Sequence, residues 1–160
     1  MKKILSLFLA IVICGICIVP ANAESEMLHT DNSGTVVVYE DGSSLTISPI
    51  QYIEINSRAT ASTQDAYRTY TYKNSSDEIE WEFILNATFS YVYGSSVTCT
   101  DTSYDYTIYK DSWKFSDGST SSSGGTAYGY GTFKNKFLLI TTKTINVEAE
   151  ITCDVYGNLS

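Results

Sequence analysis

The alternation of apolar and polar residues over positions 78–93 limits most strongly how this chain can fold. Most even positions are polar, with Ile84 and Val92 as exceptions. Successive side chains of a β-strand point to opposite faces, so this period of two predicts one long, half-buried strand or a bent strand that crosses two sheets. The odd positions that form the predicted core face are Ile79, Trp81, Phe83, Leu85, Ala87, Phe89, Tyr91 and Tyr93.

The last strand of the chain repeats this pattern. Its apolar positions are Ile145, Val147, Ala149, Ile151, Cys153 and Val155, and polar residues stand between them. Shorter β-like segments lie before and between these two, and no segment after residue 23 has a long helical period. We therefore predict an all-β fold, either an antiparallel sandwich of the immunoglobulin-like kind or a small barrel.

Polar segments divide the rest of the chain. Residues 24–34 are predicted to form a loose tail, short strands follow it, and residues 56–65 are interpreted as a linker. The main β domain is predicted to span residues 66–160. Within it, the Ser- and Gly-rich residues 119–125 are expected to be a flexible connection.

The first 23 residues follow the three-part pattern of a secretory signal. Two lysines follow the initial methionine, residues 4–19 are almost entirely apolar, and Pro20 ends that stretch. Small residues up to Ala23 then suit a signal peptidase, so cleavage is expected after Ala23. The apolar stretch is short for a membrane span of about 20 residues. We therefore expect secretion to the extracellular space rather than a retained anchor.

Charge excludes two classes of partner. The whole chain carries a net charge of −8, and removal of the two signal lysines leaves eight basic against eighteen acidic residues, a net charge near −10. Nucleic acids and anionic membrane surfaces attract proteins through clustered lysine and arginine. We expect neither nucleic-acid binding nor membrane association after signal cleavage.

Two of the four cysteines lie in the predicted signal, which leaves Cys99 and Cys153 in the mature chain. An even number of cysteines in an exported protein predicts a disulfide. The closed loop of about 55 residues would stabilise the fold by on the order of 4 kcal/mol in the chain-entropy model. Two cysteines and one distant histidine do not make a four-ligand zinc site.

Side chains suited to catalysis are few. The only histidine, His29, lies in the predicted tail, so nucleophilic catalysis of the Ser-His or Cys-His kind has no base nearby. Glu80 and Glu82 share one face of their predicted strand at a separation of roughly 7 Å, and Glu148 and Glu150 do the same on theirs. If the strands were neighbours, four carboxylates would suit a cation site or glycoside hydrolysis. A solvated outer face is the simpler interpretation, so we expect no enzyme activity, metal or cofactor.

Tyrosine is the unusual component, with thirteen residues. Four Tyr-x-Tyr pairs each place two rings on one strand face: Tyr70/Tyr72, Tyr91/Tyr93, Tyr104/Tyr106 and Tyr128/Tyr130. Rings on a sheet surface stack on sugar rings or form a protein-binding patch, whereas inward rings complete the core. For Tyr91 and Tyr93, which continue an apolar face, the core interpretation is favoured.

The predicted ligand-binding residues are drawn from these tyrosines and one tryptophan. In residues 128–131, glycine alternates with tyrosine, so the face opposite the rings is bare and permits close approach of a backbone. Trp113 stands beside polar loops and is interpreted as an exposed anchor. The full predicted set is Tyr104, Tyr106, Trp113, Tyr128 and Tyr130.

In general character, the chain resembles the small exported proteins of Gram-positive bacteria. The resemblance rests on the compact signal of residues 1–23 and on Ser-, Thr- and Tyr-rich segments such as residues 70–76. It implies export and no particular activity.

Three functional hypotheses follow. The first is a secreted or cell-surface β-sandwich that is not an enzyme and binds a carbohydrate or a protein through a tyrosine-bearing face. The second is a structural or interaction module of the cell envelope that pairs with a partner through an edge strand. The third is a glycoside hydrolase with a pair of carboxylates. Exposed rings in a row would favour the first, an unprotected edge the second, and glutamates inside a cleft the third.

Overall fold

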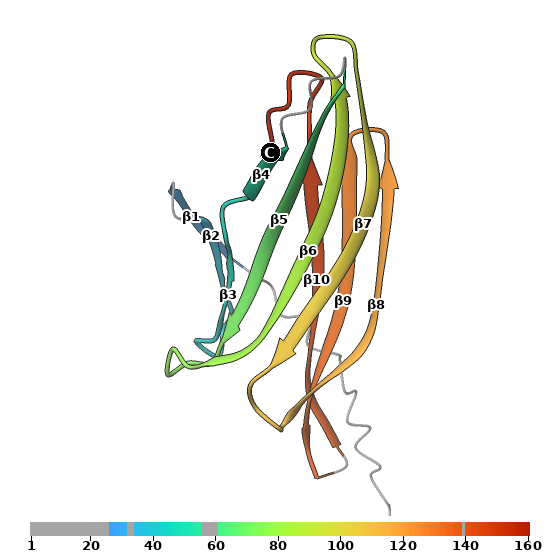
Figure 1. The fold of residues 1–160 in the computed structure, drawn as a ribbon. Helices are drawn as coiled ribbons and strands as arrows, with labels where there is room; N and C mark the ends of the chain where they lie inside the picture. Colours follow the sequence, from blue (N-terminus) through green and yellow to red (C-terminus); the bar gives the residue numbers. More distant parts are fainter. Residues whose placement is uncertain (1–25, 32–33, 56–60, 139) are drawn as a thin grey trace, which may run out of the picture.

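The protein is all-β, as predicted. The computed structural model describes residues 26–31, 34–55, 61–138 and 140–160, and this part of the chain contains ten strands and no helix. The strands form two antiparallel sheets that face each other in a sandwich-like arrangement (Figure 1). The predicted signal at residues 1–23 and the side chain of His29 lie outside what the structure describes. Within the described residues, no helix has the length and apolar character needed to cross a lipid bilayer.

The larger sheet, sheet A, contains the first seven strands in the order β1-β2-β3-β5-β6-β7, with β4 also paired to β5. Strands β3 and β4 follow each other along the same edge of β5, because β3 pairs with residues 70–73 and β4 with residues 63–67. The strands are β1 (Glu26–Asp31), β2 (Gly34–Val38), β3 (Ser44–Ile47), β4 (Gln51–Ile55), β5 (Ser62–Lys73), β6 (Ile79–Val92) and β7 (Ser96–Ile108).

The smaller sheet, sheet B, has the order β10-β9-β8 and consists of β8 (Trp113–Ser123), β9 (Thr126–Phe137) and β10 (Ile140–Thr152). Sheet A holds β1 to β7 and sheet B holds β8 to β10, so the chain crosses between the described sheets once, from β7 to β8. In the immunoglobulin fold the chain passes between its sheets several times. The strand order therefore does not confirm the immunoglobulin-like form of the prediction.

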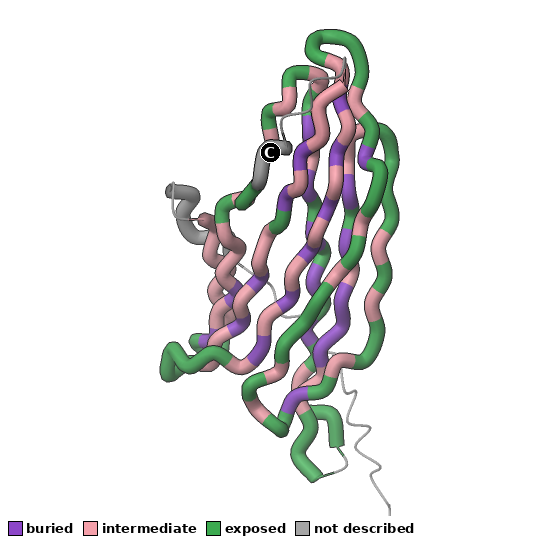
Figure 2. Tube along the Cα trace, in the orientation of Figure 1, coloured by how far each residue is buried: buried purple, intermediate pink, exposed green. Residues whose placement is uncertain are grey.

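The core lies between the sheets and follows the predicted alternation. On β6, the odd positions from Trp81 to Tyr91 are all buried, and Figure 2 shows the alternation along the strand. Ile79 and Tyr93, at the two ends of the pattern, are 40% and 76% exposed. The core interpretation of Tyr93 is therefore wrong, because the ring lies beyond the last covered position and contacts the ring of Tyr156 instead. On β10, the predicted face from Ile145 to Ile151 is buried, as is Cys153 directly after the strand, whereas Val155 is only partly buried.

Stacked aromatic rings fill one end of this core. The ring of Trp81 lies parallel to that of Tyr72 at 5.0 Å and to that of Phe133 at 3.8 Å. Trp113 meets both Tyr72 and Trp81 edge-on and is only 1% exposed. Its indole Nε1 donates to Glu80 Oε2 at 2.6 Å. The prediction that Trp113 is an exposed anchor is therefore wrong, because this first residue of β8 points inward against the rings of the other sheet.

Three polar segments are more regular than predicted. Strand β1 occupies most of the predicted tail, and β5 begins at Ser62, inside the predicted linker. Strand β8 continues through the Ser-rich residues to Ser123 because their backbones pair with β9, which leaves only Gly124 and Gly125 as the turn. Backbone pairing with a neighbouring strand does not require apolar side chains, so composition alone misjudges such segments.

Cys99 and Cys153 are both buried, and both thiols are free in the structure, which does not confirm the predicted disulfide. They lie beside the same turn, because the amide of Cys99 donates to the carbonyl of Gly124 and the amide of Cys153 to that of Gly125. Burial raises the pKa of both thiols, and for Cys153 the pKa is about 11, with a smaller contribution from Asp154. Neither thiol is therefore an activated nucleophile.

Candidate functional site

The predicted tyrosine face is divided between two places. Tyr128 and Tyr130 lie on the outer face of sheet B, where Tyr128 is 41% exposed. The hydroxyl of Tyr130 lies 3.3 Å from Asn146 Oδ1 and accepts a hydrogen bond from Thr132. In the register of β10, Glu148 and Glu150 stand opposite these two rings. The result is a flat surface with carboxylates on one side and the serines of β8 on the other.

Tyr104 and Tyr106 complete the margin of the core instead of joining that surface. Tyr104 stacks on Phe83 at 5.6 Å, and Tyr106 stacks on Phe115 at 4.0 Å. Gly131 serves the core as well, because a Cβ at this position would lie 2.9 Å from the ring of Phe83. The bare face of β9 thus admits a core ring from sheet A, and the five residues predicted to bind a ligand do not form one site.

The carboxylate pairs are also separated. Glu80 and Glu82 belong to sheet A, whereas Glu148 and Glu150 point outward from sheet B, so they do not share a face. Glu82 accepts hydrogen bonds from Thr71 and from Tyr109. No group of three or more histidine, cysteine or acidic residues able to hold a metal is present among the described residues.

A serine–lysine contact near the aromatic end of the core is structural. Lys143 Nζ donates to Ser43 Oγ at 2.8 Å and to Asp41 Oδ2 at 2.5 Å, and lies over the ring of Tyr39. Burial alone would lower the pKa of Lys143, but its hydrogen bonds with Asp41 and Tyr72 outweigh this effect and raise it. An ammonium group with a raised pKa is no general base. Lys143 instead fixes the β2–β3 turn to β10.

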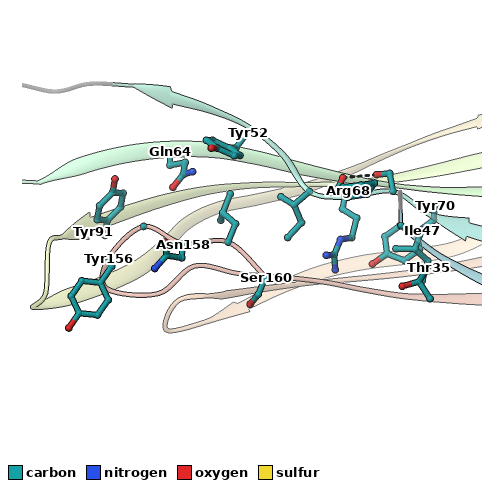
Figure 3. A pocket seen from close by; sticks show the side chains of 16 residues that line it. Thr35, Ile47, Tyr52, Gln64, Arg68, Tyr70, Tyr91, Tyr156, Asn158 and Ser160 are labelled. Carbon is teal, nitrogen blue, oxygen red and sulfur yellow. Dashed lines mark hydrogen bonds between the residues drawn. The ribbon is translucent and has the colours of Figure 1, made fainter. Parts of the chain in front are cut away.

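A groove of about 810 Å³ lies beside the inward face of β5, and we call it the β5 groove (Figure 3). Strands β3 and β4 lie on one side of it and the C-terminal residues on the other. Its described lining comprises Gly34, Thr35, Ile47, Ser48, Pro49, Ile50, Tyr52, Gln64, Arg68, Tyr70, Tyr91, Tyr156, Gly157, Asn158, Leu159 and Ser160. This volume is within the range of ordinary ligand sites.

Two polar side chains occupy inward positions of β5. The residues at even positions face the sandwich interior, where Ala66, Tyr70 and Tyr72 are buried. Gln64 is only 3% exposed, and its Oε1 has no hydrogen-bond partner among the described residues. The Nε of Arg68 is likewise buried without a described partner. A buried polar atom that lacks a partner costs about 1–3 kcal/mol. Trp81 Nε1, in the aromatic core, is a third such atom among the described residues, but only those of Gln64 and Arg68 belong to residues that line the groove.

Arg68 and Tyr70 also contact the unpaired edge of β10. Arg68 Nη1 donates to the carbonyl of Glu150 at 3.1 Å, and the amide of Glu150 donates to the Tyr70 hydroxyl at 3.3 Å. Burial raises the pKa of Tyr70, although the hydrogen bond from the Glu150 amide and the charge and hydrogen bond of the Arg68 guanidinium oppose the effect. These contacts hold the edge of sheet B against β5 and form the floor of the β5 groove.

One wall of the β5 groove begins where the edge strand breaks between β3 and β4. Pro49 has no backbone N–H and cannot donate to a sheet ladder. Ser48 bridges the break, because its amide donates to the carbonyl of Thr69 at 2.9 Å and its hydroxyl accepts from the amide of Thr69 at 3.0 Å. Tyr52 follows on β4 with 60% of its surface exposed, at the mouth of the groove.

The opposite wall is a turn organised by Asp154. Its Oδ1 accepts from the amides of Tyr156 at 2.8 Å and Asn158 at 2.9 Å. The chain then reverses, and Ser160 pairs with Thr152 through two backbone hydrogen bonds. The pKa of Asp154 is lowered by the Asn158 side chain first and by backbone amides of the turn.

Gly157 allows a tyrosine to close the end of the β5 groove. It has φ +83°, and a Cβ there would lie 2.6 Å from the ring of Tyr91. A larger residue would be strained and would push the ring away. In Figure 3 the side chains of Tyr91 and Asn158 lie at the Gln64 end of the groove.

The sequence interpretation missed Gln64 and Arg68, although a signal was present. The predicted main β domain begins at Ala66, and Ala66, Tyr70 and Tyr72 recur at even positions as one apolar face. Extending the same period places Gln64 and Arg68 on that face, as two polar residues in positions expected to be apolar.

Comparison with known proteins adds no assignment. The chain matches no protein-family model, no curated protein and no solved structure.

Proposed function

We propose that this chain is an exported, non-enzymatic binding protein that holds an oligosaccharide in the β5 groove. The observation that carries the proposal is Gln64, whose amide oxygen is buried at the groove without a described partner. An unpaired buried acceptor lowers stability, and a ligand hydroxyl that donates to it would remove that cost. We therefore propose the sugar site beside β5 instead of on the tyrosine face of β9.

The chemistry of the groove suits a sugar. A sugar hydroxyl can both donate and accept a hydrogen bond. One hydroxyl can therefore donate to the amide oxygen of Gln64, and another can accept from the guanidinium of Arg68. Tyr52 and Tyr156, which are 60% and 54% exposed, offer rings at the mouth on which a sugar can stack. The described lining contains no acidic side chain, whereas most glycoside hydrolases use two. This supports binding over cleavage.

The test is binding of the purified protein to a broad panel of glycans and insoluble polysaccharides. Gln64→Leu keeps the volume of the side chain but removes the acceptor, and we expect it to weaken binding at least tenfold, which corresponds to about 1.4 kcal/mol. The matched control is Tyr128→Ala/Tyr130→Ala on the outer face of sheet B, which should bind as the wild type does. Loss of binding in the control alone would move the site to β9, and a folded protein that binds no glycan would refute the proposal.

Export is proposed from the signal-like residues 1–23, with cleavage after Ala23. We propose further that Cys99 and Cys153 form a disulfide after export, since both thiols are buried beside the turn at Gly124 and Gly125. Intact mass and thiol titration of the denatured, unreduced secreted protein test both points. A mass that matches a chain beginning at Glu24 supports cleavage after Ala23, and the absence of titratable thiols supports the disulfide. Two titratable thiols contradict the disulfide.

A second candidate function rests on the free edge of β10. In the described part of the chain, hydrogen bonds from other elements reach the backbone of this edge at Glu150 and Thr152. An extended segment of a partner protein would pair with residues 144–148. Glu148→Pro removes an outward-facing donor without touching the β5 groove, so loss of a protein partner in this variant alone would favour edge pairing over sugar binding.

A further inference from the structure

We propose that the oligosaccharide carries a carboxylate, as a uronic acid does, and that the guanidinium of Arg68 binds this carboxylate. The inference rests on the proposed function and adds the charge class of the ligand. It follows from the charges of the lining side chains, the unpartnered Nε of Arg68 and the spacing of the two polar side chains on β5.

The side chains that line the β5 groove carry a net charge opposite to that of the chain. The protein has eighteen acidic and ten basic residues, yet the described lining contains one cation, Arg68, and no acidic side chain. The three ion pairs found among the described residues use Lys73, Lys110 and Lys143. Arg68 therefore has a half-buried charge without a described carboxylate partner. A buried charge is costly unless it is paired, so an anionic ligand is the natural complement.

The orientation of Arg68 leaves a suitable edge for a carboxylate. Its Nη1 is engaged by the carbonyl of Glu150, whereas its Nε is buried and has no described acceptor. Nε and Nη2 form the side-on edge of a guanidinium, which matches the two oxygens of a carboxylate. In Figure 3 the guanidinium of Arg68 points into the groove, toward the C-terminal wall.

Spacing favours an extended ligand over a small carboxylic acid. Gln64 and Arg68 are four residues apart on β5, a distance of about 13 Å along a strand. Tyr91 and Asn158 lie near the Gln64 end, and Tyr70 lies near the Arg68 end. One ligand that satisfies both side chains must therefore present a hydroxyl at one end and a carboxylate at the other, as an acidic oligosaccharide does.

The experiment compares acidic sugars with neutral forms of the same rings. The probes are trigalacturonate, an alginate trimer and a hyaluronan tetrasaccharide, each beside its carboxyl-reduced form, with acetate and triglutamate as carboxylates that lack the sugar. Dissociation constants are measured by calorimetry at low and high salt. We expect at least one acidic sugar to bind tenfold or more tightly than its reduced form. Acetate and triglutamate should bind more weakly than that sugar, and the preference should decrease with salt.

The decisive variant is Arg68→Met, which keeps a long apolar stem and removes the charge. It should abolish the preference for the acidic form, so that the acidic sugar and its reduced form bind to Arg68→Met with affinities within about threefold of each other, while Arg68→Lys should recover part of the preference. Thermal unfolding controls for loss of fold, and Arg68→Lys keeps the test decisive if Arg68→Met does not fold.

The outcomes separate this inference from the proposed function. Equal binding of acidic and reduced sugars would overturn the inference and leave sugar binding intact. Binding of triglutamate above every sugar, or a preference that survives in Arg68→Met, would also overturn it. If no sugar in any form binds, both the inference and the proposed function are wrong.

Discussion

Strands β5 and β6 are paired along almost their whole length, yet their inward faces have different characters. Every inward residue of β6 from Trp81 to Tyr91 is apolar or aromatic and buried. The inward face of β5 instead carries Gln64 and Arg68. The difference follows from what lies opposite, because β6 faces the middle of sheet B, whereas Arg68 reaches only the edge of β10. A position that points inward is thus a core position only where the other sheet covers it.

The sharpest contrast comes from truncating a β6 core residue. Phe83 is fully buried and contacts the rings of Tyr70, Tyr104 and Phe133, so Phe83→Ala should lower the free energy of unfolding by about 3–5 kcal/mol. Urea unfolding measures the change. The neighbouring Ile84→Ala, on the outer face, should cost much less. Equal losses in both variants would show that β6 does not have one core face.

Adding a methyl group to the facing strand should have the next largest effect. In Gly131→Ala the new Cβ would lie 2.9 Å from the Phe83 ring, and crowding of this kind costs about 1–3 kcal/mol. The double variant Gly131→Ala/Phe83→Leu should recover part of the loss, because a smaller side chain makes room. Additive losses in urea unfolding would contradict direct contact between these two positions.

On β5 we expect a substitution on the inward face to change the free energy of unfolding in the opposite direction. Gln64→Leu removes a buried amide that has no described partner, so the free energy of unfolding without ligand should stay constant or increase by about 1 kcal/mol. The same variant should lose the stabilisation that bound sugar gives the wild type. Thermal unfolding with and without sugar measures both effects. A loss above about 1 kcal/mol without ligand would mean that the amide supports the fold.

The smallest change in stability should come from lowering the pH. The group that responds is Asp41, which pairs with Lys143 at the aromatic end of the core and joins the two sheets. Burial alone would raise the pKa of Asp41, but hydrogen bonds from Lys143 and Ser43 lower it to about 2 from an ordinary value of 3.8. The stabilisation that ionised Asp41 provides is therefore complete above about pH 4 and is lost as the pH falls toward 2.

The Asp41 prediction is tested by acid titration of stability. Because the Asp41 side chain is 56% exposed, Asp41→Asn should cost less than about 1 kcal/mol at neutral pH, and the wild type and variant should converge on acidification. Urea unfolding from pH 7 to 2 follows this difference. A difference that grows toward pH 2 would contradict the assignment.

The sequence predicted the parts of the fold that depend on one strand at a time. The core faces of β6 and β10 follow from a period of two, and that period needs no knowledge of neighbours. The exposed role of Trp113 was wrong because the packing of a ring depends on the facing sheet. The Ser-rich part of β8 was missed because its order comes from pairing with β9.

The candidate site was not predicted, for a related reason. Three segments that are far apart in the sequence line the β5 groove, namely residues 48–52, 64–70 and 156–160. No local pattern shows that β5 extends past the edge of β10. The two polar residues on the inward face of β5 were the only indication of the site in the sequence. They can be interpreted only once it is known which part of that face sheet B covers.

The single crossing from β7 to β8 has a consequence for how the chain reaches its native state. Strands β5 to β7 and β8 to β10 each join through successive hairpins, so each block can assemble through contacts between neighbouring segments. Local pairing requires little loop closure and is fast. Docking of the two blocks is the step that brings distant segments together, and it is expected to limit the folding rate. Because Arg68 meets Glu150 only in that step, the groove should appear last, together with the final burial of the core.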